Sequence, residues 1–343
     1  SWLVLLIYFV HLLLSMNFTT KIPISPVAED NQLSYATPVV SMGSCFAAHM
    51  QEKFAYYKLP FFSHPFGTLF HPLAIERSLE RACLGQLFTE EDFFLEEDLW
   101  LSFDLHSQWA NTSLTALLDT LNQDMERLRE SLTKTSFLII TLGTAWVYEH
   151  LATGNIVANC HKQPQKLFRK RLLLLSEIEA SLRHIIQLVQ QRQPAIKVIF
   201  TVSPVRHLKD GAQENLLSKS LLICAIHQLL GTGGRESSEH LFYFPSYEIL
   251  MDELRDYRFY KEDMLHPTEQ AVQYVWERFA EAFFTSDAQV LMQEVASIQR
   301  ALAHRPFNPE GEKHQKFLHS LQEKIKKIQE KLGFGEQWFV SEN

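Results

Sequence analysis

The sequence lacks the cysteine pattern that a disulfide-stabilised fold or a structural zinc site requires. Its 343 residues contain four cysteines, and no two of them form a Cys-x-x-Cys pair. In a chain of this length, scattered cysteines indicate reduced thiols in a cytosol-like compartment, so we expect a cytoplasmic protein. The histidines also lack a paired metal-ligand spacing. We therefore expect no metal and no other cofactor.

A basic surface and a membrane-spanning segment are missing too. The net charge is −8 and no basic stripe is interleaved with aromatic residues, which argues against nucleic acid as a partner. Residues 2–14 are almost wholly apolar, but a bilayer requires about 20 such residues. They also lack the basic start of a signal peptide. We interpret residues 1–15 as upstream sequence that precedes the native start at Met16; the alternative is a truncated anchor that associates with a membrane. We expect no stable membrane insertion.

What the chain does contain is a regular alternation of apolar strands and amphipathic helices. With 46% hydrophobic and 21% charged residues, it is typical of a globular protein. The alternation predicts a three-layer α/β/α fold with a mostly parallel sheet. We expect strands at 37–42, 136–143, 197–202 and 241–244, and helices at 45–56, 113–132, 175–193, 214–230 and 268–284.

A helical extension is expected to follow the sheet domain. We place the domain at residues 16–284 and the extension at 285–343, with helices at 287–302 and 312–332. The second helix carries an apolar stripe that is predicted to cover a groove or to pair with another helix. Self-association of the protein through this helix is one such pairing.

The turn Gly43-Ser44-Cys45 joins the first strand directly to a helix. Glycine permits the tight turn, and the helix start leaves backbone N–H groups free beside a hydroxyl and a thiol. Such a turn can hold an anion or a nucleophile. The alternative is that Ser44 caps the helix and Cys45 is a small buried residue.

Other polar residues follow later strands or precede the last helix of the domain. Parallel sheets bind ligands beyond the carboxyl ends of their strands, which here carry Thr144, Arg206 and His207. Asp263 precedes His266 by three residues, so its carboxylate can hold one imidazole nitrogen while the other faces a nucleophile. Alternatively, Asp263 caps the helix, and Arg206 makes a structural ion pair.

Several motifs between Met16 and Phe284 resemble the GSCFA family. The name-giving motif is Gly43-Ser44-Cys45-Phe46-Ala47. Further blocks that resemble the family are Pro65-Phe66-Gly67, Leu142-Gly143-Thr144-Ala145-Trp146, Ala158-Asn159-Cys160-His161-Lys162, Ser203-Pro204-Val205-Arg206 and Asp263-Met264-Leu265-His266-Pro267. The resemblance implies an SGNH hydrolase-like fold with flavodoxin-like topology, and cleavage of esters.

The same resemblance implies roles for individual residues. The first SGNH block places Cys45 at the nucleophile position, and the last block falls on Asp263 and His266. The block that normally supplies an oxyanion asparagine falls on Gly143-Thr144-Ala145-Trp146, which has none. Losing one such donor costs about 2.7–4 kcal/mol. Thr144, Asn159, Arg206 and His207 are the candidate replacements, with Gly43 and Gly143 beside them.

The nucleophile itself has two candidates. A helix N-terminus and a histidine would lower the pKa of Cys45 and favour thiolate chemistry, whereas Ser44 would give an ordinary serine esterase. The register favours Cys45. We therefore expect an esterase or acyltransferase that acts on a small polar or glycan substrate. The competing hypothesis is an inactive ligand-binding protein of the same fold.

Overall fold

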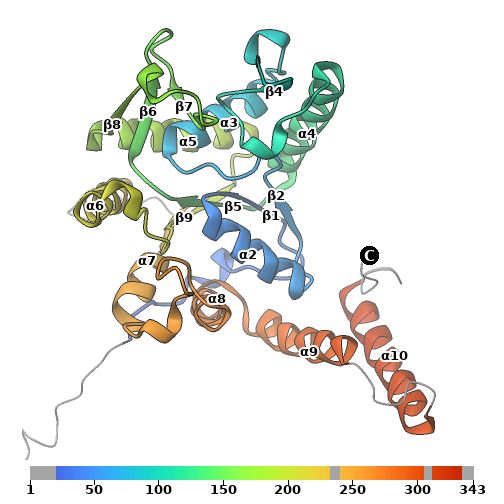
Figure 1. Ribbon diagram of the computed structural model, residues 1–343. Coiled ribbons are helices and arrows are strands. Elements are labelled where there is room, and N and C mark those ends of the chain that lie inside the picture. The colour runs from blue at the N-terminus through green and yellow to red at the C-terminus, as the bar shows by residue number, and fades with distance from the viewer. Residues whose placement is uncertain (1–20, 232–239, 305–310, 334–343) are drawn as a thin grey trace, which may run out of the picture.

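The computed structural model describes residues 21–231, 240–304 and 311–333, so the expected leader at residues 1–15 lies outside the described residues. Within those ranges, five parallel strands form a central sheet in the order β10-β9-β5-β1-β2 (Figure 1). Their bounds are β1 Val39–Gly43, β2 Phe61–Ser63, β5 Phe137–Leu142, β9 Lys197–Val202 and β10 Leu241–Phe244. Among the strands of this sheet, the first along the chain (β1) lies between the second (β2) and the third (β5), which is the flavodoxin-like order. The predicted fold class is confirmed.

Helices cover both faces of this sheet (Figure 1). One face packs against α3 (Pro72–Leu84), α4 (Leu114–Lys134), α5 (Leu175–Arg192) and α6 (Ala212–Leu229), and the other against α2 (Cys45–Tyr56) and α8 (Glu269–Phe283). Alternate side chains of β5 divide between the two cores: Leu138 and Ile140 face the first, and Phe137 and Ile139 face the second. Burial on both faces explains why the central strands are continuous apolar runs.

The helices follow from apolar spacing and from capping residues. In α4, apolar side chains recur every three or four residues and are all buried, namely Leu117, Leu121, Met125, Leu128 and Leu132. The side chain of Ser113 accepts a hydrogen bond from the N–H of Ala116 and caps this helix. The spacing buries one stripe of the helix, while the charged residues between remain at the surface.

The structure contains strands that the sequence pattern did not predict. The edge strand β2 has three residues and pairs with β1 at Val39↔Phe61. For residues 144–164 we expect a hairpin-like insertion, and the structure has a three-stranded antiparallel sheet of β6 (Trp146–His150), β7 (Ile156–Val157) and β8 (Phe168–Leu172). A short hairpin also forms from β3 (Phe94–Glu96) and β4 (Leu99–Leu101). These strands are short and rich in polar or aromatic residues, so pairing with their neighbours decides their conformation.

The helical extension consists of α9 (Ser286–Ala303) and α10 (Glu312–Leu332), close to the expected ranges. Leu321 and Ile328 of α10 are buried in the same core as α9, whereas Phe317 is 40% exposed. The stripe thus pairs with a helix of its own chain, and self-association stays a prediction. Among the described residues, no helix has both the length and the apolar character needed to cross a membrane.

Gly43, the last residue of β1, is expected to tolerate no side chain. Its φ is +130°, and a Cβ would lie 2.1 Å from the carbonyl oxygen of Thr141 on β5. We predict that Gly43→Ala lowers the free energy of unfolding by about 3 kcal/mol or more, because the overlap is with backbone. Urea denaturation measures this loss.

Gly154 provides the matched control for that substitution. Its φ is +71°, but a Cβ there meets nothing within 4 Å. Gly154→Ala should therefore cost only the backbone strain, about 1–2 kcal/mol. Equal losses for the two variants would contradict the steric role of Gly43.

Candidate active site

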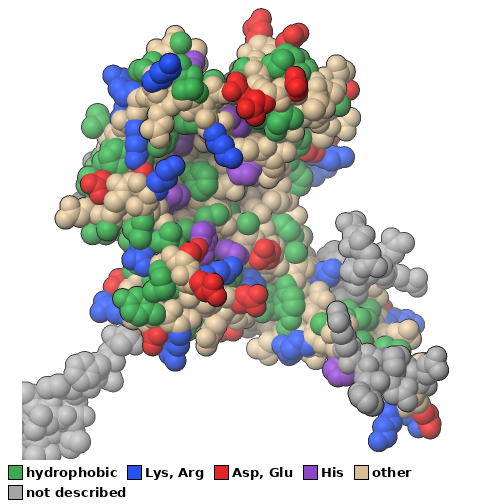
Figure 2. Space-filling view, viewed as in Figure 1, with side chains coloured by type: hydrophobic (Ala, Val, Ile, Leu, Met, Phe, Trp, Pro, Cys, Tyr) green, Lys and Arg blue, Asp and Glu red, His purple; other side chains and the backbone are tan. Residues whose placement is uncertain are grey.

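The candidate site lies between the carboxyl ends of β1 and β5. From β1 the chain continues to β2 on one side of the sheet, and from β5 it continues to β9 on the other, so this is the switch point of the sheet. Ligands bind at such switch points in open α/β sheets. Here the turn Gly43-Ser44-Cys45 leads into α2, and Gly143 follows β5. A Cβ on Gly143 would lie 3.0 Å from the Cβ of Ser44, so the absence of a side chain lets the two turns pack together. Histidine, lysine and arginine side chains, with acidic side chains among them, lie near the middle of one face (Figure 2).

Ser44 is buried, and its hydroxyl is not the helix cap that the alternative interpretation required. Ser44 occupies the N-cap position of α2, but within the described residues its side chain makes no hydrogen bond. Its N–H donates to the carbonyl of Thr141 at 2.9 Å. A cavity of about 360 Å³ lies next to the turn and is lined in part by Gly43, Ser44 and His64. The hydroxyl atom itself is enclosed.

Cys45 is half-buried and begins α2. Burial raises the pKa of its thiol, while the charge of Lys219 and the N–H groups of Phe46 and Cys45 act to lower it. The net direction is upward, so the predicted lowering of the Cys45 pKa is wrong. The helix N-terminus and a cation do favour the thiolate, as expected, but the desolvation of a half-buried thiol is the larger effect.

Asp263 and His266 form the pair that their spacing predicted. The Nδ1 atom of His266 lies 2.5 Å from Oδ2 of Asp263, and Oδ1 accepts the N–H groups of Leu265 and His266, each at 2.9 Å. These hydrogen bonds hold the pKa of Asp263 well below its usual range. The carboxylate is therefore ionised at neutral pH and fixes the imidazole by Nδ1, which leaves Nε2 as the nitrogen available for proton transfer.

The helix after this pair begins later than expected. Thr268 caps α8, whose first residue is Glu269, and its hydroxyl accepts the N–H of Ala271. Asp263 is thus not a helix cap, and Pro267 lies before the helix in a bridge with Tyr260. The pair stands in an exposed turn, with side chains 46% and 41% accessible for Asp263 and His266.

Arg206 holds this turn against the end of β9. Its guanidinium lies over the ring of Tyr260 at 5.3 Å and donates to the carbonyl of Met264 at 3.4 Å. Both contacts are to the segment that carries Asp263 and His266. In the described part of the chain, Arg206 forms no ion pair with a carboxylate. Its contacts make it a tether of the turn, and the expected structural ion pair is absent there.

His207 is largely buried next to Arg206. Its ring packs edge-on against the ring of Phe70, with 5.5 Å between the centroids. Its backbone N–H donates to Oδ1 of Asn215. Burial, with the charges of Lys219 and His266, lowers its pKa to about 4. The imidazole is therefore neutral at neutral pH. Its Nε2 is buried and has no hydrogen-bond partner among the described residues.

The other candidate oxyanion donors are engaged elsewhere. The N–H groups of Gly143 and Thr144 both donate to the carbonyl of Phe70, at 2.8 and 2.9 Å. The hydroxyl of Thr144 lies 3.1 Å from that of Ser218 and accepts the N–H of Trp146. Thr144 is therefore used to fix its own turn.

Asn159 lies in the loop after β7. Its side-chain amide donates to the hydroxyl of Ser107 at 3.0 Å, and its carbonyl accepts the N–H of His161. The backbone N–H of Asn159 donates to Phe103. These bonds tie the residue to the segment between β4 and α4.

Lys219 of α6 is the residue that sequence analysis missed. It is 1% exposed, and its Nζ donates to the carbonyls of Gly143 and Ser203, each at 2.7 Å. Burial lowers its pKa to about 7. The sequence did contain a signal. The positions that form the buried face of α6 recur at helical spacing, and the first of them are polar although the rest are apolar. These positions are Asn215, Ser218, Lys219, Leu222, Ala225, Ile226 and Leu229.

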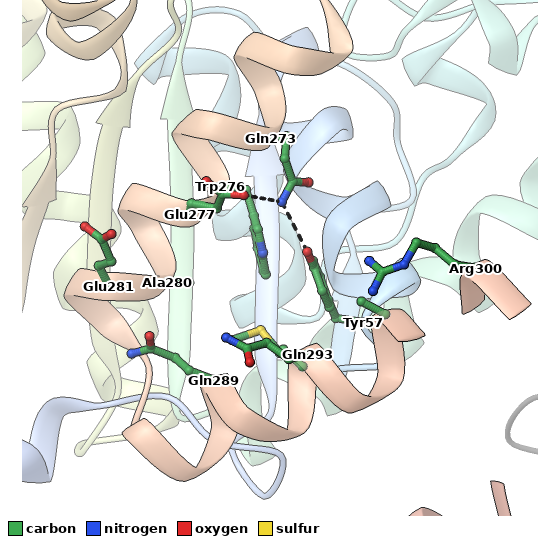
Figure 3. A pocket seen from close by; sticks show the side chains of 11 residues that line it. Tyr57, Gln273, Trp276, Glu277, Ala280, Glu281, Gln289, Gln293 and Arg300 are labelled. Carbon is green, nitrogen blue, oxygen red and sulfur yellow. Dashed lines mark hydrogen bonds between the residues drawn. The ribbon is translucent and has the colours of Figure 1, made fainter. Parts of the chain in front are cut away.

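A larger cavity, of about 530 Å³, lies between α8 and α9, away from the strand ends. Figure 3 shows that Gln273 bridges the hydroxyl of Tyr57 and the carboxylate of Glu277 across one side of it. Trp276 and Met292 contribute apolar surface. Its described lining contains no cysteine, serine or histidine. The candidate catalytic residues therefore lie at the carboxyl ends of the sheet strands and not in this cavity.

No curated protein matches the chain. One similar solved structure is the crystal structure of a carbohydrate esterase family 3 from Talaromyces cellulolyticus. It is 11% identical, with 76% of this chain and 99% of that chain covered and a TM-score of 0.34. Another is a mutant acetyl esterase with an acetate ion, at 12% identity, the same coverage of 76% and 99%, and a TM-score of 0.30.

Two family profiles match the sequence itself. The profile of the GSCFA family matches residues 38–279, and that of the GSCFA domain protein C-terminal domain matches residues 295–336. The first match includes the Ser44-Cys45 turn, the end of β5, the end of β9 and the Asp263–His266 turn. Since it covers more than half of the chain, the protein belongs to the GSCFA family.

Proposed function

We propose that the protein is a thiol-dependent hydrolase that cleaves an ester of a small polar or glycan substrate. The observation that carries this proposal is that two features lie at the carboxyl ends of the strands. Cys45 begins α2 at the switch point, and the bonded Asp263–His266 pair is tethered to the end of β9 by Arg206. Nucleophile, base and orienting carboxylate are the parts that acyl transfer requires.

Accessibility and electrostatics favour Cys45 over Ser44 as the nucleophile. Cys45 is half-buried, whereas the Ser44 hydroxyl is enclosed. The charge of Lys219 acts on both Cys45 and His207, and His207 in turn feels His266. Cys45 and His207 therefore share Lys219 as a charged neighbour.

The proposed reaction has two steps. His266 accepts the thiol proton at Nε2, and the Cys45 sulfur attacks the ester carbonyl. The C–O bond then breaks, the alcohol leaves with that proton, and a thioester remains. A water molecule next gives a proton to His266 and attacks the thioester. The acid is released, and the thiol regains its proton. An alcohol in place of water would make the same site an acyltransferase.

Two groups could stabilise the oxyanion in place of the missing asparagine. The first turn of α2 presents the N–H groups of Cys45 and Phe46 next to the sulfur. Neutral His207 has a buried Nε2 without a described partner, and a neutral imidazole can donate to an oxyanion. His207 is therefore preferred to Thr144, Asn159 and Arg206, whose side chains have the other contacts described above.

The competing function is ligand binding without turnover. One observation favours it: the N–H groups of Gly143 and Thr144 are both used by the carbonyl of Phe70. An acyl-transfer site with too few oxyanion donors would bind an ester or an acid without cleaving it. Turnover assays separate the two functions.

We predict that Cys45→Ala abolishes hydrolysis of a short-chain aryl acetate by the full chain, with a loss of about a thousandfold or more. Ser44→Ala should retain activity, because the enclosed hydroxyl does not take part. Cys224→Ala, which removes an exposed thiol of α6, is the matched control. Loss of turnover in Ser44→Ala alone would identify a serine esterase. A wild-type rate equal to that of the buffer would favour the binding function.

We further predict that Asp263→Asn lowers kcat/KM by about a hundredfold or more, because the imidazole loses the carboxylate that orients it and stabilises its cation. The depressed pKa keeps Asp263 ionised until the pH falls well below its usual titration range. The acid limb of the wild-type pH–rate profile should therefore reflect other groups.

Asp256→Asn is the control for this variant. Asp256 is exposed in the same segment, where its carboxylate caps a short helical turn by accepting the N–H of Arg258. The substitution should leave kcat/KM nearly unchanged. A comparable loss in both variants would contradict a specific role of the Asp263–His266 pair.

A further inference from the structure

We propose that Lys219 is the internal counter-charge of the site, a positioning residue whose ammonium group stabilises the thiolate of Cys45. This inference rests on the proposed role of Cys45 as the nucleophile. It assigns a function to a buried lysine of α6 that belongs to none of the motifs shared with the family.

The hydrogen bonds of Lys219 place its charge at the centre of the sheet edge. Its Nζ donates to the carbonyl that follows β5, on Gly143, and to the one that follows β9, on Ser203, both at 2.7 Å. Gly143 packs directly against Ser44 in the turn that leads to Cys45. One ammonium group thus links the ends of β5 and β9, and Gly143 brings it next to the turn that carries Cys45.

The charge of this lysine has no acidic partner in the described structure. The ion pairs there do not include Lys219, and the ring of Tyr247 in α7 (Ser246–Glu248) lies 5.7 Å from its Nζ. A buried cation that is bonded only to neutral groups carries a large desolvation penalty. The thiolate of Cys45 would compensate this charge.

The two groups are expected to titrate as a coupled pair. Burial lowers the pKa of Lys219 to about 7, and Cys45 acts to raise it; burial raises the pKa of Cys45, and Lys219 acts to lower it. Proton loss from the thiol is therefore easier while the lysine is charged.

Other titratable groups surround the pair. His207, on the loop after β9, feels the charges of Lys219, Asp210 and His266, and Tyr247 faces Lys219 from α7. With its pKa near 4, His207 is neutral across the range in which the thiol and the amine titrate. Burial raises the pKa of Tyr247, so it is neutral as well. Below about pH 7, where Lys219 keeps its proton, the charge that Cys45 experiences from within the core is therefore that of Lys219.

A purely structural role would not require a lysine. Two carbonyl oxygens can be bridged by a neutral amide donor, which costs less to bury than an ammonium group. The matched variants are therefore Lys219→Gln, which keeps donors but removes the charge, and Lys219→Arg, which keeps the charge.

The test measures alkylation of the full chain by iodoacetamide as a function of pH. The Cys45 sulfur forms a bond to carbon, and iodide leaves. Mass spectrometry resolves each cysteine, so exposed Cys224 serves as the internal control. We expect Lys219→Gln to slow the alkylation of Cys45 at neutral pH by about tenfold, which corresponds to a rise of about one unit in the pKa of its thiol. Lys219→Arg should retain most of the alkylation rate. Cys224 should react equally in all three proteins.

A second measurement leaves the lysine in place, should Lys219→Gln not fold. Coupling between two groups is reciprocal, so Cys45→Ala should lower the pKa of Lys219, as followed by the NMR shifts of its side chain. An unchanged pH profile of Cys45 in folded Lys219→Gln, equal slowing in Lys219→Gln and Lys219→Arg, or an unchanged Lys219 titration in Cys45→Ala would overturn the proposal.

Neither measurement uses a substrate, so the two proposals can fail separately. Lys219-dependent reactivity in a protein without esterase turnover would reject the hydrolase and retain the counter-charge. Esterase turnover that depends on Cys45, together with alkylation that is independent of Lys219, would reject the counter-charge and retain the hydrolase.

Discussion

The close approach of β1 and β5 at their carboxyl ends is the constraint on which the site depends. Gly43 leaves no room for a Cβ beside the carbonyl of Thr141, and Gly143 leaves little room beside Ser44. Two glycines from different strands therefore let the β1–α2 turn and the end of β5 pack together. This contact places the start of α2, with its N–H groups and Cys45, at the switch point of the sheet.

Around this contact, polar groups lie at the ends of β5 and β9. Lys219 links the carbonyls that follow these two strands, and Arg206 and His207 lie in the loop after β9. Arg206 then reaches the turn of Asp263 and His266 through Tyr260 and Met264. A chain with hydrophobic residues at these positions would form the same sheet at a lower desolvation cost. Their presence together is consistent with the charge chemistry proposed for the ends of these strands.

The long elements were predictable because their side-chain periods are decided locally. The expected strand 197–202 coincides with β9, and the helix 45–56 with α2. Short elements were missed for the opposite reason: β2 has three residues in a segment rich in proline and glycine, and only its pairing with Val39 makes it a strand.

By itself, the sequence determined the order of strands and helices, the three-layer class, the GSCFA motif and the Asp263–His266 hydrogen bond, since each depends on neighbours within a few residues. Only the tertiary structure decided the burial of Cys45, which reverses the direction expected for its pKa, and the use of the Gly143 and Thr144 N–H groups by Phe70. The same holds for the arrival of Lys219 from α6 at the ends of β5 and β9. Desolvation and hydrogen bonding between segments distant in the chain depend on packing, and packing is the part of the fold that local patterns leave open.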